Sequence, residues 1–428
     1  MIIGLNTIWV ILAAAMIVFM EGGFSLLEAG FVRSKNAVNI TMKIFVDLTF
    51  GALAFYLLGF HLMFGKDLYG IIGQAVSVTH GPGGLPLPAY ILFQIAFAIA
   101  VASIVSGAVA ERMKFSTYIL VTVIVCGVLY PISGHWIWSE NGWLAKLGMK
   151  DFAGSAAIHA MGGFAALALA RLLGPRQQRF NWANRSINEF APSNIPLASA
   201  GAFILWFGWF GFNAGSTLNA MDSRLSLIAL NTFLAAAAGG ASTMLYYMVR
   251  KKPVDPGMVI NGSLAGLVAI TAGCAFVTET AAVITGLVAG ILVIFATDWV
   301  ERLKIDDPVG AVAVHGFNGV FGTIAVGLFD IHEGLFTTGH AHLLFVQSLG
   351  ALASAVWGFV TAFVVGILLK VSTGIRVSSV DEKRGLDLSV HGIAAYNYRG
   401  NEFMPGVEER DGHVYKPLVF SAQDGTNK

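Results

Sequence analysis

Charged residues are scarce in this chain. Asp, Glu, Lys and Arg make up 12% of its 428 residues, whereas hydrophobic residues make up 56%. Soluble domains carry about twice that charged fraction, so the composition excludes an ordinary soluble enzyme or binding domain. The formal net charge of +1 gives no indication of a nucleic-acid partner. The first residues, MIIGLNTIWV, lack the basic start of a cleavable signal peptide, so none is expected.

Cysteine is almost absent as well. Cys126 and Cys274 are the only two, and both fall in apolar runs. This usage predicts neither a disulfide framework nor a cysteine-based metal cluster. No cofactor is expected on these grounds.

Long apolar runs are what the sequence does contain. Runs near or beyond the roughly 20 residues needed to cross a bilayer recur along most of the chain. They predict an all-α, polytopic membrane protein of the cell membrane with eleven transmembrane helices and bound lipid around them. The predicted spans are 5–31, 38–63, 88–110, 116–138, 152–174, 194–219, 225–249, 257–278, 280–300, 308–329 and 342–371.

Basic residues alternate sharply between successive loops. One set of loops holds thirteen of them: Arg33, Lys35, Arg112, Lys114, Arg171, Arg176, Arg179, Arg185, Arg250, Lys251, Lys252, Arg302 and Lys304. The other set holds four: Lys66, Lys146, Lys150 and Arg224. The positive-inside rule makes the first set cytoplasmic. The N-terminus is then outside, and eleven crossings leave the C-terminus in the cytoplasm.

Two near-copies lie about 150 residues apart: DFAGSAAIHAMGG from Asp151 and DPVGAVAVHGFNG from Asp307. Their spans enter the membrane from opposite sides, which indicates a five-plus-five inverted repeat with its functional site near the midplane. Each histidine lies eight residues after its aspartate, about 12 Å along a helix. His159 and His315 are therefore predicted to meet at mid-membrane.

The two aspartates have a structural interpretation. Asp151 and Asp307 stand where helix N-caps are expected, and Pro308 suits a first helical position. For Asp307 capping is the favoured interpretation, whereas Asp151, on the outer side, could equally stabilise a cation. An offset of eight residues turns each histidine away from its aspartate, so the pair does not predict a metal site. No motif of an enzyme occurs in a plausible setting.

Several aromatic and polar residues share helix faces within the spans. The candidates are Phe93, Gln94 and Phe97 in span 88–110, Trp209, Phe212, Asn213 and Ser216 in span 194–219, and Trp138 at an outer helix end. Aromatic stripes usually belong to the core, and tryptophans at span ends usually belong to the interfacial belt. Spacing alone therefore favours the structural interpretation. Lys43 and Asp47, four residues apart, are expected to form an ion pair, and Glu28 and Glu111 are expected to be structural.

These residues fall within a recognisable set of motifs. The motifs are EAGFVRSKN, FQIAFA, GAVAERMKFS, DFAGSAAIH, GWFGFNAGS, DDPVGAVAVHG and RGLDLSVHG, spread over about residues 20–396. Together they resemble the ammonium transporter family (Amt), of prokaryotic type. The presence of Trp138 and Ser216 favours Amt over the related Rh proteins. The chain departs from some family members at Gly310, where they have an aspartate.

The resemblance implies a role for each candidate. Trp138, Phe97 and Ser216 would recruit ammonium at the outer side, with Asp151 as the acidic residue required nearby. Phe97 and Phe212 would form a stacked gate, and His159 and His315 would line a hydrophobic pore. The other candidates, Phe93, Gln94, Trp209, Asn213 and Asp307, come from the spacing and capping patterns alone and are expected at most to support these residues. The family assembles as a homotrimer with one pore in each subunit.

Two functions remain open from the sequence. The first is transport, in which ammonium loses a proton at the gate and crosses as ammonia. The second is ammonium sensing through the same site. We expect a transmembrane domain over 1–372 and a cytoplasmic tail over 373–428, whose last 32 residues are polar. This tail is either an unstructured terminus or an arm that binds a PII-class signalling protein.

Overall fold

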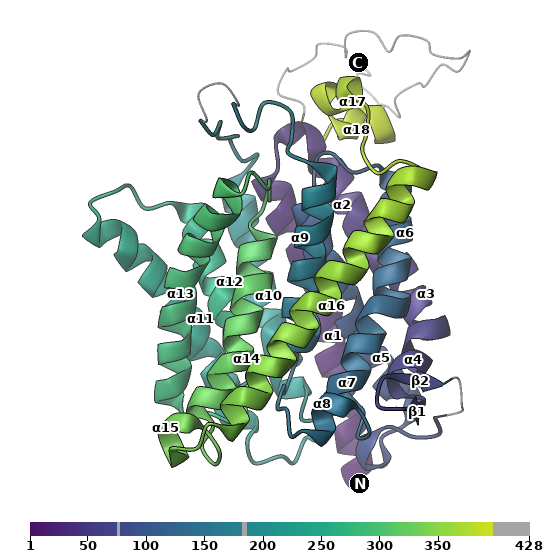
Figure 1. Ribbon diagram of the computed structural model, residues 1–428, viewed down its shortest axis with the longest axis vertical. Helices are drawn as coiled ribbons and strands as arrows, with labels where there is room; N and C mark the ends of the chain where they lie inside the picture. The colour runs from purple at the N-terminus through teal and green to yellow at the C-terminus, as the bar shows by residue number, and fades with distance from the viewer. Residues whose placement is uncertain (75–77, 182–185, 397–428) are drawn as a thin grey trace, which may run out of the picture.

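The computed structural model describes residues 1–74, 78–181 and 186–396. Ten helical segments in this part of the chain are long and apolar enough to cross a membrane, and a shorter apolar helix covers Pro256–Ile270. The prediction of an all-α, polytopic membrane protein is confirmed. The count of eleven crossings and the orientation stay predictions. Helix α16 runs diagonally across the front of the other helices (Figure 1).

Helices make up most of the described part of the chain, and its two named strands form one small hairpin. The main helices are α1 (Ile2–Phe31), α5 (Leu87–Ala108), α9 (Met161–Leu173), α10 (Ile195–Gly215), α11 (Leu225–Val249), α12 (Pro256–Ile270), α13 (Glu279–Arg302), α14 (Asn318–Phe329) and α16 (His342–Ser372). Shorter helices are α2 (Ala37–Val46), α3 (Ala52–Ala54), α4 (Phe60–Phe64), α6 (Phe115–Ile124), α7 (Tyr130–Trp138), α8 (Trp143–Lys146), α15 (Leu335–Thr338), α17 (Ser379–Arg384) and α18 (Leu386–His391). Strands β1 (Lys66–Leu68) and β2 (Ile72–Gln74) pair as an antiparallel hairpin.

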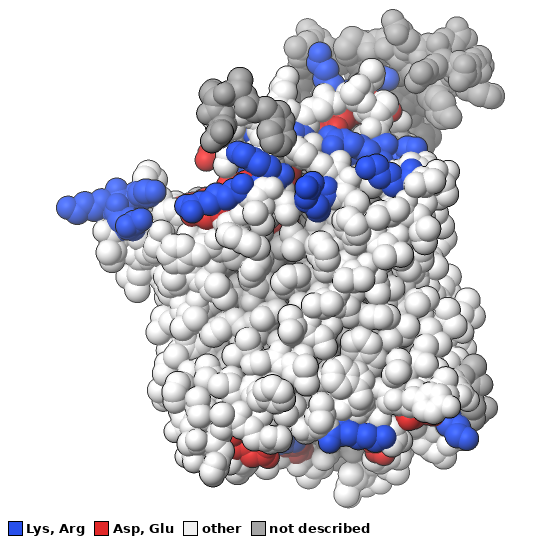
Figure 2. Space-filling view, in the orientation of Figure 1, with Lys and Arg blue, Asp and Glu red and all other residues white. Residues whose placement is uncertain are grey.

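On the face seen in Figure 2, charged side chains at the surface gather at the two ends of the molecule. Figure 2 shows a broad uncharged belt, with most Lys and Arg side chains at the end that carries α17 and α18 and few at the other. We call these the tail end and the N-terminal end, because residue 1 lies at the latter (Figure 1). The separation agrees with the division of loops made from the sequence.

Wide, π-helical turns interrupt several spans. They cover Asp47–Gly51, Phe55–Gly59, Val125–Leu129, Ser155–Ala160 and Val312–Phe317. Such turns shift the side chains that follow them around the helix axis and are frequent at functional sites. The last two segments hold the two histidines of the repeat. No feature of the local sequence predicted them.

The predicted span 257–278 is too long. Helix α12 ends at Ile270 and is followed by turns. The carbonyls of Thr271 and Ala272 accept hydrogen bonds from Ala153 N and Phe152 N, at 3.2 and 3.1 Å. These two carbonyls accept hydrogen bonds from the start of the predicted span 152–174. The α-helix therefore ends at Ile270, although the sequence that follows it is still apolar.

Ion pairs tie the helix ends together at the tail end. Arg176 contacts both Asp306, at 2.8 Å, and Glu111, at 2.6 Å, and Arg33 also reaches Glu111. Burial would raise the pKa of Asp306, but the guanidinium groups of Arg112 and Arg176 outweigh burial and hold this pKa well below its ordinary value. The structural interpretation of Glu111 agrees with these contacts.

The predicted ion pair between Lys43 and Asp47 is wrong. Lys43 Nζ donates instead to the carbonyl of Val109 at 3.4 Å and lies 5.1 Å from the centre of the Tyr118 ring. The Asp47 carboxylate instead accepts hydrogen bonds from the hydroxyl groups of Tyr118 and Thr122 on α6. Neighbouring helices, rather than the offset of four residues, decide the partners of both side chains.

The start of the predicted tail is ordered against the helices. Asp387 of α18 accepts a hydrogen bond from the backbone nitrogen of Asn39 at the start of α2, and Leu386 N donates to Asn36 Oδ1. Burial raises the pKa of Asp387. The polar segment 397–428, expected to be either an unstructured terminus or an arm, lies outside the described residues.

Candidate functional site

The two repeated histidines meet, as the sequence predicts. His159 Nδ1 and His315 Nδ1 are 3.1 Å apart, and the ring centres are 5.2 Å apart with planes inclined by 27°. A contact between two ring nitrogens needs one proton, so one imidazole donates and the other accepts. Both side chains are buried, with exposed fractions of 2% and 5%.

Aromatic rings surround this pair. The His159 ring stacks with Trp209 at 5.4 Å and with Phe212 at 5.7 Å, measured between ring centres. Phe24 of α1 lies 6.3 Å from the His315 ring, a neighbour that sequence reasoning missed. Trp209 is fixed by a hydrogen bond from its Nε1 to Thr271 Oγ1. The histidines therefore lie in a largely apolar environment.

One polar atom of the pair has no partner. Nε2 of His159 is buried and makes no hydrogen bond within the described residues. Leaving a buried polar group unpaired costs about 1–3 kcal/mol, so such atoms usually have a functional reason. Here Nε2 can serve as donor or acceptor for a small polar molecule, according to the tautomer.

Both aspartates of the repeat act on helix starts, although not as the sequence predicted. The helical segments begin at Ser155 and Val312, so Asp307 is not the N-cap residue and Pro308 is not the first helical residue. Gly154 and Gly310 have φ of +114° and +80° and delay both starts. Only glycine adopts such a conformation without strain. A glycine at the same place in both copies was the available signal.

The aspartates accept hydrogen bonds from the delayed helices. Asp151 accepts from four backbone nitrogens at 2.9 Å each: Gly154, Ser155, Ala156 and Ala157. Asp307 accepts from two, Ala311 and Val312. Burial raises the pKa of Asp151, while these backbone donors act against that rise. Burial likewise raises the pKa of Asp307, to about 6. Neither aspartate is the N-cap residue itself, but both accept hydrogen bonds from backbone nitrogens at a helix start, which is the role of a capping side chain.

An aromatic stack lies next to the histidines. The Phe97 and Phe212 rings are 4.3 Å apart and inclined by 30°, and both are buried. Phe93 lies 4.7 Å from Phe97 on the same helix. Trp138 approaches Phe97 edge-on, with ring centres 6.0 Å apart and planes at 87°. The candidate residues Phe93, Phe97, Trp138, Trp209, Phe212 and both histidines thus form one continuous cluster.

Trp138 and Ser216 differ from the stacked phenylalanines in exposure, because both are only half-buried. Trp138 Nε1 donates to the carbonyl of Asp151 at 2.7 Å, which fixes the indole. Ser216 Oγ donates to the carbonyl of Phe212 at 2.8 Å, one turn back along α10. Solvent exposure therefore decreases from Trp138 and Ser216 towards the buried stack of Phe97 and Phe212.

The remaining candidates are less involved. Asn213 Nδ2 donates to Thr232 Oγ1 of α11, a contact between helices. Gln94 is buried, and its Oε1 has no partner among the described residues.

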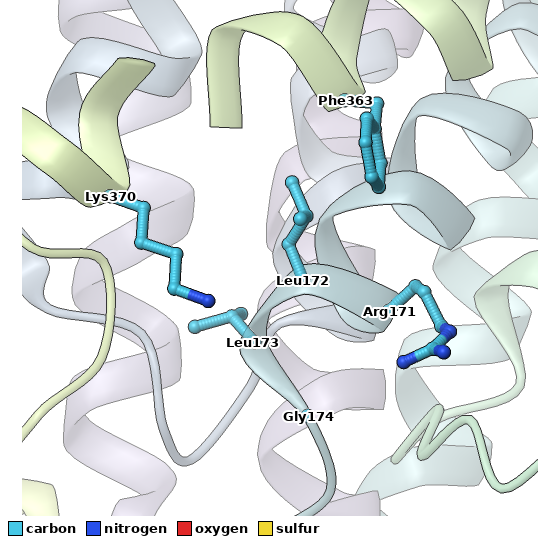
Figure 3. Close-up of a pocket in the computed structure, with 6 residues that line it drawn as sticks. All are labelled: Arg171, Leu172, Leu173, Gly174, Phe363 and Lys370. Carbon is cyan, nitrogen blue, oxygen red and sulfur yellow. The ribbon is translucent and has the colours of Figure 1, made fainter. Parts of the chain in front are cut away.

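A separate pocket of about 420 Å³ lies at the tail end between α9 and α16 (Figure 3), lined by Arg171, Leu172, Leu173, Gly174, Phe363 and Lys370. It contains none of the candidate residues.

Comparison with known proteins points to one family. A model of the Ammonium Transporter Family matches residues 8–396. Ammonium transporter Amt2 of Archaeoglobus fulgidus is 42% identical over 411 residues, covering 91% of this chain and 87% of that protein. Ammonium transporter 1 member 3 of Solanum lycopersicum is 34% identical over 429 residues, covering 92% and 93%.

Solved structures give the same result. A structure described as a sensor Amt protein has a TM-score of 0.87 and 40% identity, covering 91% of this chain and 98% of that one. The crystal structure of Candida albicans Mep2 has a TM-score of 0.80 and 29% identity, covering 88% and 87%.

Proposed function

Because the chain belongs to the Ammonium Transporter Family, a family of multi-pass transporters of the cell membrane rather than of enzymes, we propose that it carries ammonium through the cluster described above. Ammonium binds beside Trp138, Phe97 and Ser216, loses a proton at the Phe97–Phe212 stack, and crosses as ammonia past His159 and His315. Asp151 supplies negative charge near the outer site.

The chemistry of the substrate favours this order of events. Ammonium and potassium ions are alike in charge and size, so a simple sieve separates them poorly. Moving either bare ion through an apolar region costs tens of kcal/mol. Ammonium alone can lose a proton and become neutral. A path lined by aromatic rings therefore selects against potassium once deprotonation is required.

The observation that carries the proposal is the histidine pair. Two imidazoles that share one proton, with a further buried nitrogen left unpaired, supply both a donor and an acceptor in an apolar setting. Ammonia needs such partners to cross without water. A histidine pair of this kind suits a small hydrogen-bonding molecule better than an ion.

The remaining assignments extend the same proposal. The transmembrane domain covers 1–372 and the cytoplasmic tail covers 373–428, with the N-terminus outside. Three copies form a homotrimer with one path in each, and the tail is the surface for a PII-class signalling protein. Crosslinking in native membranes tests the trimer, and co-purification with a PII-class protein tests the partner.

Ammonium-evoked currents in proteoliposomes test the transport path. We expect His159→Asp and His315→Glu to reduce the selectivity for ammonium over potassium, because each replaces a neutral ring with an acid that attracts cations. His135→Gln is the matched control, since His135 is also buried but its two ring nitrogens contact Met63 and Asp67 rather than another histidine. Unchanged selectivity in both acidic variants would rule out the histidine filter.

Ammonium sensing is the second candidate function. It is favoured by the likeness to a structure described as a sensor Amt protein. A sensor would bind ammonium at Trp138, Phe97 and Ser216 without sustained flux and would pass the signal through the tail. Proteoliposomes distinguish the two, because a sensor shifts its ammonium-dependent fluorescence or stability while giving no steady current.

A further inference from the structure

Four ionisable side chains lie buried in the spans beside the proposed path. They are Glu21 and Glu28 of α1 and Lys43 and Asp47 of the second span, with exposed fractions of 3%, 2%, 0% and 0%. Ionisable groups inside a membrane are costly and commonly mark ion or proton routes. The proposed transport path gives none of them a role.

A single hydroxyl connects two of the carboxyl groups. Ser103 Oγ of α5 lies 2.7 Å from Glu21 Oε2 and 3.3 Å from Asp47 Oδ2, and its third contact is the carbonyl of Ile99 at 3.2 Å. A hydroxyl has one proton to donate, so it can donate to only one carboxylate. For both carboxyl contacts to be hydrogen bonds, at least one of the two carboxyl groups must carry a proton and donate it to Ser103.

The surroundings indicate which group carries that proton. Tyr118 Oη lies 2.8 and 2.7 Å from the two oxygens of Asp47, and Thr122 Oγ1 donates to Asp47 at 2.8 Å. Hydroxyl donors stabilise a charged carboxylate. Glu21 has only Ser103, and its Oε1 is buried without a partner among the described residues. Asp47 is therefore the carboxylate, and Glu21 is the protonated acid.

This arrangement allows a balanced proton transfer. The proton on Glu21 Oε2 passes to Ser103 Oγ while the proton of Ser103 passes to Asp47 Oδ2. Glu21 becomes a carboxylate, Asp47 becomes an acid, and Ser103 regains its hydroxyl, so no bond other than O–H forms or breaks. The unpaired Oε1 of Glu21 leaves one position open to receive the next proton.

The position in the fold suits such a transfer. Glu21 lies three residues, about one helical turn, before Phe24, whose ring centre is 6.3 Å from that of His315. Lys43, one turn before Asp47, donates to Val109 at the end of α5 nearer the tail end. The other groups that face this cluster are Glu28, which accepts from Ser106, and the thiol of Cys126.

We propose that Glu21, Ser103 and Asp47 form a proton relay in the tail-end half of the membrane, which holds one exchangeable proton and conducts the proton that ammonium releases. The inference rests on the proposed transport function. The alternative is a purely structural clamp between the first, second and third spans, and the experiments below separate the two.

Infrared difference spectroscopy of the reconstituted protein tests the proton directly. The wild-type protein should show the C=O stretch of a buried protonated carboxyl group at neutral pH. Glu21→Gln should remove the component of this band that Ser103→Ala shifts, whereas Ser106→Ala, which affects Glu28, should leave that component unchanged. Ser106 is the matched control, because its hydroxyl reaches only Glu28. If Glu21→Gln and Ser103→Ala leave every component of the band unchanged, Glu21 is not the protonated acid and the relay is overturned.

The ratio of charge moved to substrate taken up tests conduction. Current and uptake of labelled methylammonium are measured on the same proteoliposomes. In Glu21→Gln and Asp47→Asn we expect current per substrate to fall by about tenfold or more, since an amide cannot pass the proton on. A ratio equal to that of the wild type, in variants that still take up substrate, shows a structural clamp and overturns the relay.

The same measurements separate this inference from the proposed function. If the wild-type protein takes up no substrate, the transport proposal fails, and the infrared band still reports whether the cluster holds a proton. If Asp47→Asn does not assemble, the ratio of charge moved to substrate taken up is compared between Ser103→Ala and Ser106→Ala. A lower ratio in Ser103→Ala alone supports the relay, and equal ratios in the two variants contradict it.

Discussion

Gly163 of the first repeat copy lies so close to Gly316 of the second that a Cβ on Gly163 would come within 2.1 Å of the Gly316 nitrogen. The contact is reciprocated, because a Cβ on Gly319 would come within 2.5 Å of the Ala160 nitrogen. Each copy thus carries a glycine, one turn after its histidine, where the other copy's backbone passes. This close approach brings the two imidazoles together.

The first prediction concerns this contact. Gly163→Ala should destabilise the protein by about 1–3 kcal/mol or more, because the rigid backbone of the other copy cannot give way as a side chain can. Gly162→Ala is the control, since its Cβ would meet only side chains, at 3.3 Å. The thermal unfolding midpoint in detergent is the measurement. Equal midpoints for the two variants would contradict the prediction.

The second prediction compares the two aspartates of the repeat. Asp151→Ala leaves four backbone nitrogens without their acceptor, whereas Asp307→Ala leaves two. We expect a loss of about 2–4 kcal/mol for the first variant and a smaller loss for the second. Thermal midpoints of both variants at pH 7 give the comparison. A larger loss for Asp307→Ala would refute this ranking.

The third prediction concerns the outer site. Trp138→Leu should raise the half-saturating ammonium concentration by roughly 2- to 30-fold, which corresponds to a cation–π contact of about 0.5–2 kcal/mol. Ser216→Ala should raise it by about fivefold, the value of one hydrogen bond. Concentration dependence of the evoked current is the measurement. Trp206→Leu, a half-buried tryptophan that packs on Phe233, is the control and should leave the concentration unchanged.

The fourth prediction concerns acid stability. The pKa of Asp306 is held below its ordinary value, so the folded state binds fewer protons there than the unfolded state. The ionised Asp306 therefore contributes fully to the free energy of unfolding above about pH 4, and this contribution is lost as the pH falls further. Asp306→Asn should therefore cost about 3–5 kcal/mol at pH 7 and flatten the acid dependence of the thermal midpoint.

The control for acid stability is Asp222→Asn. Asp222 pairs with Arg224, whose side chain is 45% exposed, and such surface pairs contribute about 0–1 kcal/mol. If Asp306→Asn and Asp222→Asn lower the neutral midpoint equally, the buried ion pairs at the tail end do not stabilise the fold as described.

Much of the fold was accessible from the sequence for a physical reason. Bilayer thickness fixes the length of an apolar run, so most spans were found within a few residues, and α11 was predicted without error. The meeting of His159 and His315 followed from equal spacing in two spans of opposite direction. These features depend on one element at a time or on a symmetry between two.

The parts that escaped prediction depend on contacts between elements. The π-helical turns around both histidines, the early end of α12 at Ile270 and the partners of Lys43 are decided by neighbouring helices. The cluster of Glu21, Ser103 and Asp47 joins three spans, and no spacing within any one of them reveals it. Only Gly154 and Gly310 indicated in the sequence that the helices carrying His159 and His315 begin later than predicted.

Asp151 has a consequence for how substrate entry can be controlled. Its carboxylate fixes the first turn of the helix that carries His159, while its carbonyl fixes the Trp138 indole. Asp151 therefore joins the proposed entrance at Trp138 to the helix of the proposed filter at His159, so a displacement of one is expected to move the other. A proposed gate that opened by rotation of aromatic side chains would leave these hydrogen bonds intact, whereas one that opened by tilting either helix would break them.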